Sequence, residues 1–116
     1  MSFTDKPLKI ISRITPHHIT MIVRGEVDLA TAPQLSHEIA DRLSHCPDVT
    51  LHLDLSGVPF FDSSGLHVLL AGQRTARLLG GELILTGTSP QVDLLLEVTG
   101  AQFPSAPAPA RAAATG

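Results

Sequence analysis

The stretch "VTLHLDLSGVPFFDSSGLHVLL", residues 49–70, changes its hydrophobic period near its middle. From 49 to 55 apolar and polar residues alternate, which is the period of a half-buried β-strand. From 63 onward the apolar residues recur every three or four positions, which is the period of an amphipathic helix. An acidic residue, two serines and a glycine stand where the two periods meet, at 62–65. The stretch therefore predicts a strand, a short loop and a helix that opens on two hydroxyl groups.

The same two periods alternate through the rest of the chain. We expect strands at 8–14, 18–27, 49–55 and 82–87, and helices at 31–46, 63–81 and 89–100. Strands that alternate with helices predict parallel strands joined by right-handed crossovers, here after an N-terminal antiparallel hairpin. The predicted fold is a single α/β domain with a mixed four-stranded sheet, or five strands if a stub at 102–103 adds one. Clean alternation within the strands predicts helices mainly on one face.

Capping residues predict where the three helices begin. Thr31, followed three residues later by Gln34, predicts a capping box. Asp62 is expected to cap the second helix. Ser89, followed by Pro90, is expected to open the third helix, because proline is tolerated at the first helical position.

Length and composition exclude several classes of protein. The 116 residues, 43% of them hydrophobic, suffice for one domain, which we place at 1–103, before an Ala/Pro-rich tail at 104–116 that we expect to be disordered. A formal charge of −3 argues against nucleic acid and against an anionic membrane surface as partners. One cysteine, no signal peptide and no apolar run of membrane-spanning length predict a cytoplasmic protein. We expect no metal and no other cofactor, because neither metal-ligand spacing nor a P-loop is present.

The Asp-Ser-Ser-Gly sequence at 62–65 allows three interpretations. In the structural one, Asp62 caps the helix and both serines are ordinary residues of its first turn. A nucleophilic serine, as in a small hydrolase, would need a base and an oxyanion hole, and the Gly-x-Ser-x-Gly elbow is absent. A serine that accepts phosphate is the third, since a phosphoserine at a helix N-terminus gains about −1.5 to −2 charges beside free N–H groups.

Two motifs resemble the STAS domain family, which includes the anti-sigma factor antagonists. "LDLSGVPFFDSSGLHVLL" (53–70) resembles the family signature, and "VRGEVDLATAPQL" (23–35) resembles its second motif, in the family's order. The resemblance covers about residues 6–103. In the antagonist branch the serine directly after the aspartate is phosphorylated, and that position is Ser63 here. Asp28 matches the acidic residue near the family's site.

This resemblance implies a regulatory module that is not an enzyme. Its unphosphorylated form binds an anti-sigma factor that is itself a serine kinase, which releases the sigma factor. Phosphorylation of Ser63 ends the binding, and a serine phosphatase resets the switch. Asp28 is expected to orient the loop or to hold the Ser63 hydroxyl, while Ser64 and Gly65 keep the first turn small for the partner's approach. We expect partner-binding residues at Asp28, Thr31, Gly57, Asp62, Ser63, Ser64, Gly65 and His67, within a docking loop at 57–65 and its surroundings.

One alternative keeps the STAS fold without the phosphoswitch. The chain would then be a constitutive subunit of a stress-signalling scaffold or of a lipid-transport complex. Either way we expect a monomer or a weak homodimer.

Overall fold

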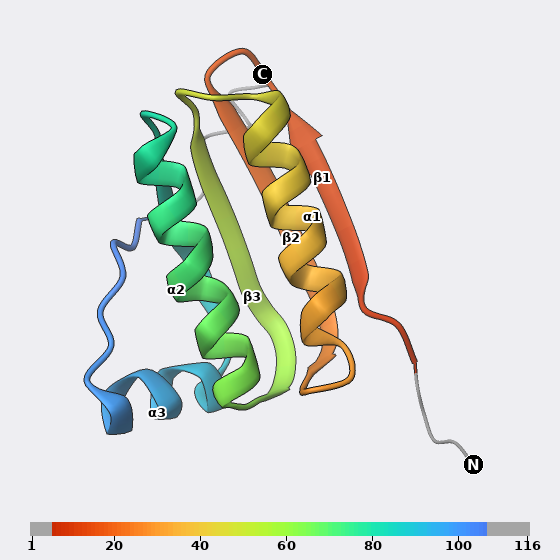
Figure 1. Ribbon diagram of the computed structural model, residues 1–116. Coiled ribbons are helices and arrows are strands. Elements are labelled where there is room, and N and C mark those ends of the chain that lie inside the picture. The colour runs from red at the N-terminus through yellow and green to blue at the C-terminus, as the bar shows by residue number, and fades with distance from the viewer. Residues whose placement is uncertain (1–5, 107–116) are drawn as a thin grey trace, which may run out of the picture.

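The computed structural model describes residues 6–106 (Figure 1). It contains β1 (Lys9–Ile14), β2 (His18–Val27), α1 (Ala32–His45), β3 (Thr50–Phe61), α2 (Ser63–Leu78), β4 (Glu82–Thr88) and α3 (Pro90–Thr99). The order and type of these elements confirm the prediction made from the hydrophobic periods. Most of the expected disordered tail, from 107 onward, lies outside the described residues.

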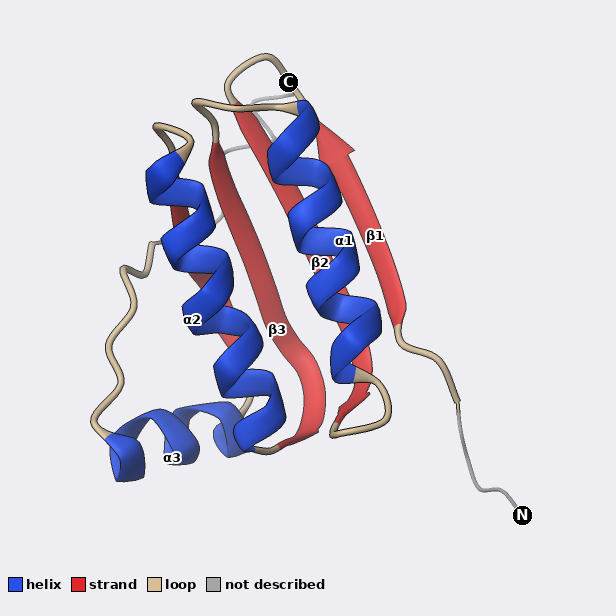
Figure 2. Cartoon of the chain, in the orientation of Figure 1, coloured by secondary structure: helices blue, strands red, loops and turns tan. Residues whose placement is uncertain are grey.

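The sheet is mixed and has four strands in the order β1-β2-β3-β4. β1 pairs with β2 in antiparallel fashion, and β2, β3 and β4 run parallel to one another. α1 and α2 lie side by side on one face of this sheet, and α3 lies near the start of α2 at one end (Figure 2). The predicted hairpin and the predicted placement of the helices are both confirmed.

After α3, the described residues up to 106 add one bridge to the sheet rather than a fifth strand. The Leu85 N–H donates to the Pro104 carbonyl over 2.9 Å, and the Ala106 N–H donates to the Leu85 carbonyl over 3.1 Å. Ser105 is thereby paired with Leu85 in parallel fashion. The expected stub therefore lies at 104–106 and not at 102–103.

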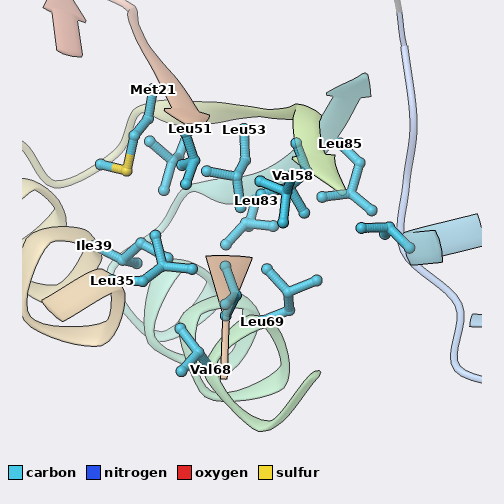
Figure 3. Packing of buried hydrophobic residues seen from close by; sticks show 14 of the residues in the cluster. Met21, Leu35, Ile39, Leu51, Leu53, Val58, Val68, Leu69, Leu83 and Leu85 are labelled. Atoms are coloured by element: carbon cyan, nitrogen blue, oxygen red, sulfur yellow. The ribbon is translucent and has the colours of Figure 1, made fainter. Parts of the chain in front are cut away.

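The core fills the space between the sheet and the two long helices (Figure 3). Met21, Leu51 and Leu83, from three neighbouring strands, are fully buried there. Leu35, Ile39 and Leu43 of α1 are buried against them, and Leu69 of α2 joins the cluster. Burying a Leu or Ile side chain stabilises a fold by about 1.5–3 kcal/mol, so this layer holds the helices in register with the strands.

β3 continues to Phe61, six residues beyond its predicted end at 55. The alternation stops in this second half because the pairing with β2 shifts register twice, and the buried residues become Val58 and Phe61, three positions apart. Pairing with β4 ends at Leu55, so among the described strands the extension pairs with β2 alone. Pro59 is tolerated there because an edge does not need its missing N–H. The predicted docking loop at 57–65 was therefore wrong: most of it is strand.

The predicted capping box at the start of α1 was also wrong. The Thr31 side chain makes no capping bond to the helix, although Thr31 is the residue at the N-cap position. The Gln34 amide instead binds the N-terminal arm: its oxygen accepts from the Leu8 N–H over 2.8 Å, and its nitrogen donates to the Leu8 carbonyl over 3.0 Å. Tertiary pairing with the arm has replaced the local bond that the spacing predicted. By contrast, the predicted cap of α3 is confirmed, since the Ser89 hydroxyl accepts from the Val92 N–H.

A pair of histidines lies on the face of the sheet opposite the helices. His52 is only 6% exposed, and its Nε2 lies 2.9 Å from Nδ1 of His18 on the neighbouring strand. The Nδ1 of His52 is buried without a hydrogen-bond partner among the described residues. Burial, and secondarily the charge of His18, hold the pKa of His52 below its ordinary value. The register places Thr20 of β2 and Ile84 of β4 directly beside His52. The charged residues around this pair are Asp54, two residues on along β3, Glu82, two residues before Ile84, and Arg13 of β1, which is paired with Thr20.

Because the pKa of His52 is lower in the folded chain than in the unfolded one, the unfolded chain binds more protons as the pH falls past about 6.5. We expect the free energy of unfolding to decrease between about pH 7.5 and 5.5, and to decrease less in His52→Leu. Urea unfolding at several pH values measures both slopes. His37→Leu, an exposed histidine of α1, is the control and should keep the wild-type slope. Equal slopes for wild type and His52→Leu would contradict the assignment.

Candidate functional site

The ends of β2 and β3 bring two predicted segments together. Both strands run parallel, so their carboxyl ends lie at the same edge of the sheet, where α/β folds place their sites. The Asp62 N–H, directly after β3, donates to the carbonyl of Val27, the last residue of β2, over 3.2 Å. The β2–α1 loop (28–31) and the first turn of α2 therefore lie next to each other, at the end where both helices begin (Figure 1).

Asp62 caps α2, as the sequence predicted. Its backbone is extended, and its Oδ1 accepts a hydrogen bond from the Ser64 N–H over 2.8 Å. Ser63, the first residue of the helix, is exposed, and its hydroxyl makes no hydrogen bond to another described residue. The structure therefore presents a free hydroxyl at a helix N-terminus, next in the chain to a carboxylate that is already fixed by its capping bond.

Gly65 is buried beneath the first turn of α2. A Cβ atom at this position would lie 2.5 Å from Cε1 of Phe61 and 2.9 Å from Cγ1 of Val27. Its small size is therefore required by the core below, whatever its role toward a partner. The first turn of α2 packs directly against the Phe61 ring, and this contact fixes the distance between Ser63 and the sheet.

Gly65→Ala should destabilise the fold by about 1–3 kcal/mol, because the ring of Phe61 must move to admit a methyl group. In a Phe61→Leu background, Gly65→Ala should cost less stability than it does in the wild type, since the smaller leucine leaves room for the methyl group. Urea unfolding of the four proteins gives the coupling free energy between the two positions. A wild-type stability for Gly65→Ala would contradict the packing argument.

Asp28 organises the β2–α1 loop. Its Oδ1 accepts from the N–H groups of Ala30 and Thr31 over 3.0 and 3.1 Å. Thr31 completes the loop: its hydroxyl donates to the Glu26 carbonyl over 2.7 Å and accepts from the Asp28 N–H over 3.0 Å. Asp28 thus fixes its own loop, and in the described part of the chain no hydrogen bond joins it to Ser63.

The remaining predicted residues fall into two groups. Ser64 and His67 lie on the same first turns of α2 as Ser63, with His67 exposed and Ser64 half-buried. Gly57 lies within β3, where a Cβ would meet the Arg24 side chain at 3.0 Å. Four extended residues, about 13 Å, separate it from the end of the strand, so the structure does not bring Gly57 to Ser63.

α3 supports the site from below, which the sequence did not predict. The Ser89 hydroxyl donates to the Val58 carbonyl over 2.6 Å, and the Gln91 amide donates to the Phe61 carbonyl over 3.5 Å. These bonds hold the last residues of β3, directly before Asp62. Ser89 followed by Pro90 predicted where α3 begins, but no local pattern indicates which strand a capping side chain also binds.

The site contains an acceptor hydroxyl and carboxylates, without a base bonded to the hydroxyl. No histidine of the described chain is hydrogen-bonded to Ser63, so the nucleophile–base contact of a serine hydrolase is not formed there. Within 6–106 no group of three or more His, Cys, Asp or Glu is arranged to hold a metal ion. No helix in that range has the length and apolar character needed to cross a membrane.

The candidate site therefore lies at one edge of a mixed four-stranded sheet in the described chain, with the exposed Ser63 at the start of α2. Residues 11–102 match the family model described as "Mlab, STAS domain". The chain belongs to the STAS domain family.

Known proteins similar to this chain share both its sequence and its fold. It is 35% identical over 83 residues to an anti-sigma-B factor antagonist of Listeria monocytogenes, covering 72% of each chain. An anti-sigma factor antagonist from Mycobacterium paratuberculosis superposes with a TM-score of 0.76 at 27% identity, covering 92% of each chain. The anti-sigma factor antagonist SpoIIAA in its unphosphorylated form superposes with a TM-score of 0.73 over 92% of each chain, and its 21% identity shows the shared fold alone.

Proposed function

We propose that this protein is an anti-sigma factor antagonist controlled by phosphorylation of Ser63. The observation that carries the proposal is the exposed, unbonded hydroxyl of Ser63 at the N-terminus of α2, in a chain 35% identical to an anti-sigma-B factor antagonist. In the unphosphorylated form the first turns of α2 and the β2–α1 loop bind an anti-sigma factor that is also a serine kinase. The sigma factor is then released. The protein is cytoplasmic and acts by binding, not by catalysis.

The chemistry of the switch belongs to the kinase. The Ser63 oxygen attacks the γ-phosphorus of ATP, its proton passes to the kinase's base, and ADP leaves with the electrons of the broken P–O bond. A serine phosphatase later removes the phosphate by hydrolysis. This chain supplies the acceptor oxygen on a rigid support: the Asp62 cap, the Phe61 ring beneath Gly65, and the α3 bonds to the end of β3.

Electrostatics explain why phosphorylation would end binding. The phosphate adds about −1.5 to −2 charges beside the Asp62 carboxylate, at the edge of the sheet that also carries Asp28. The positive end of the α2 helix dipole would stabilise the phosphate in water. In a closed interface the same charges are desolvated and repel one another, and a penalty of about 3 kcal/mol lowers affinity more than a hundredfold.

Ser63→Ala should bind the anti-sigma factor with near wild-type affinity and accept no phosphate, whereas Ser63→Asp should bind at least tenfold more weakly. Incubation with candidate anti-sigma kinases and ATP, followed by mass spectrometry of the peptides, locates the phosphate. Ser64→Ala is the matched control and should still be phosphorylated at position 63. Phosphate found on another residue, or wild-type binding by Ser63→Asp, would refute the switch.

A second candidate function follows from the description of the matching family model, which names Mlab. On this alternative the chain is a constitutive subunit of a lipid-transport or stress-signalling complex, and Ser63 is only a contact residue. Purification of the tagged protein from its own cells distinguishes the two: a kinase-fold partner supports the antagonist, and an ATPase or membrane permease supports the transport subunit.

A further inference from the structure

Leu29 is 79% exposed, in the loop next to the start of α2. Complete burial of a leucine is worth about 1.5–3 kcal/mol, and this side chain gains almost none of it within the chain. Its exposure does not come from a loose backbone. The neighbouring residues are held by the Asp28 carboxylate and the Thr31 hydroxyl, and the Ala32 N–H donates to the Asp28 carbonyl over 2.8 Å. The loop is a rigid turn that holds a large apolar side chain out into solvent.

A shallow groove of about 280 Å³ opens beside this leucine, between the first turns of α1 and α2. Its walls carry apolar atoms, small hydroxyls and one imidazole, and no carboxylate, ammonium or guanidinium group; the lining residues are Leu29, Ala32, Pro33, Ser36, Ser64, His67 and Val68. Neither helix has an acidic residue in its first turn. This lining suits an aliphatic side chain and offers no counter-charge for a charged one.

The groove is continuous with the phosphorylation site, because Ser64 in its wall is the residue after Ser63. A kinase that closes on the Ser63 hydroxyl covers Ser64 and His67 as well, and therefore also covers the groove. A second copy of this chain seated there would block the kinase from Ser63, so the two occupants exclude each other.

We infer that Leu29 and this groove form the apolar anchor of the partner interface, with Leu29 entering a pocket of the anti-sigma kinase and an aliphatic side chain of the kinase entering the groove. The inference rests on the proposed function and adds to it the part of the surface that supplies affinity. Phosphorylation of Ser63 then controls the binding, while Leu29 and the groove beside it supply most of the affinity. Interface energies are commonly concentrated in such buried apolar contacts.

The test uses the full chain and the anti-sigma kinase that phosphorylates it, selected from a panel of purified anti-sigma kinases and loaded with ADP so that no phosphate is transferred. Leu29→Ser removes the anchor, and Ser36→Leu fills the groove; titration calorimetry should show at least a tenfold weaker Kd for each. The matched controls lie at the far ends of the same helices: Leu78→Ser, 80% exposed, and Ser44→Leu, also exposed. Both controls should bind within twofold of wild type.

Other outcomes separate this inference from the proposed function. If Leu29→Ser and Ser36→Leu bind like wild type while Ser63→Asp binds weakly, the anchor is refuted and the switch stands. If wild type is neither bound nor phosphorylated by any kinase of the panel, both are refuted. If Leu29→Ser abolishes self-association in light scattering and leaves kinase affinity unchanged, the groove binds a second copy and the inference is overturned. Urea unfolding of every variant confirms that a lost interaction is not a lost fold.

Discussion

The contact between Gly65 and the Phe61 ring fixes the position of everything at the functional end of this molecule. Phe61 is the last residue of β3 and is fully buried, and the α2 backbone passes so close above it that no Cβ fits. Val27, at the end of β2, closes the same space from the other side. Because protein interiors are close-packed, a change in any of these three residues moves the start of α2. The exposed serine thus depends on a contact in the core.

Hydrogen bonds around this contact complete the support without using the serine itself. The Asp62 side chain caps the helix, its N–H binds the end of β2, and α3 binds the carbonyls of Val58 and Phe61. The Asp28 Oδ1 accepts hydrogen bonds from the N–H groups of Ala30 and Thr31 in its own loop. The Asp62 and Asp28 carboxylates are therefore each engaged by backbone N–H groups, whereas the Ser63 hydroxyl makes no hydrogen bond to another described residue. In the described chain no base is hydrogen-bonded to the Ser63 oxygen, and this fits the proposal that another protein's base activates it.

The fold was predictable from the sequence because its main signals are local. Alternation at 18–27 and 49–55, four-residue spacing at 35–43, and the caps Asp62 and Ser89 each report on neighbouring residues. The errors arose where tertiary pairing overrides local pattern. β3 extends to Phe61 because β2 pairs with it through two register shifts, and Gln34 leaves its capping role because the Leu8 backbone is within reach. The candidate site followed the same rule: the caps were predictable, whereas the burial of Gly65 and the separation of Gly57 from Ser63 depend on how distant strands meet.

Leu29, in the inferred anchor, shows why a binding surface is harder to recognise in a sequence than a core. Within 23–35 it follows Asp28 and precedes Ala30, and nothing in that order distinguishes an apolar residue in a turn from one that starts a buried stripe. Only the structure shows that the α1 stripe begins after it, at Ala32, and that the loop holds Leu29 on the solvent side. The separation between a residue that is phosphorylated and a residue that supplies affinity has a physical reason. A serine that must accept a phosphate cannot be buried deeply, so it contributes little affinity of its own. A switchable binding site therefore needs an uncharged anchor next to the group that switches.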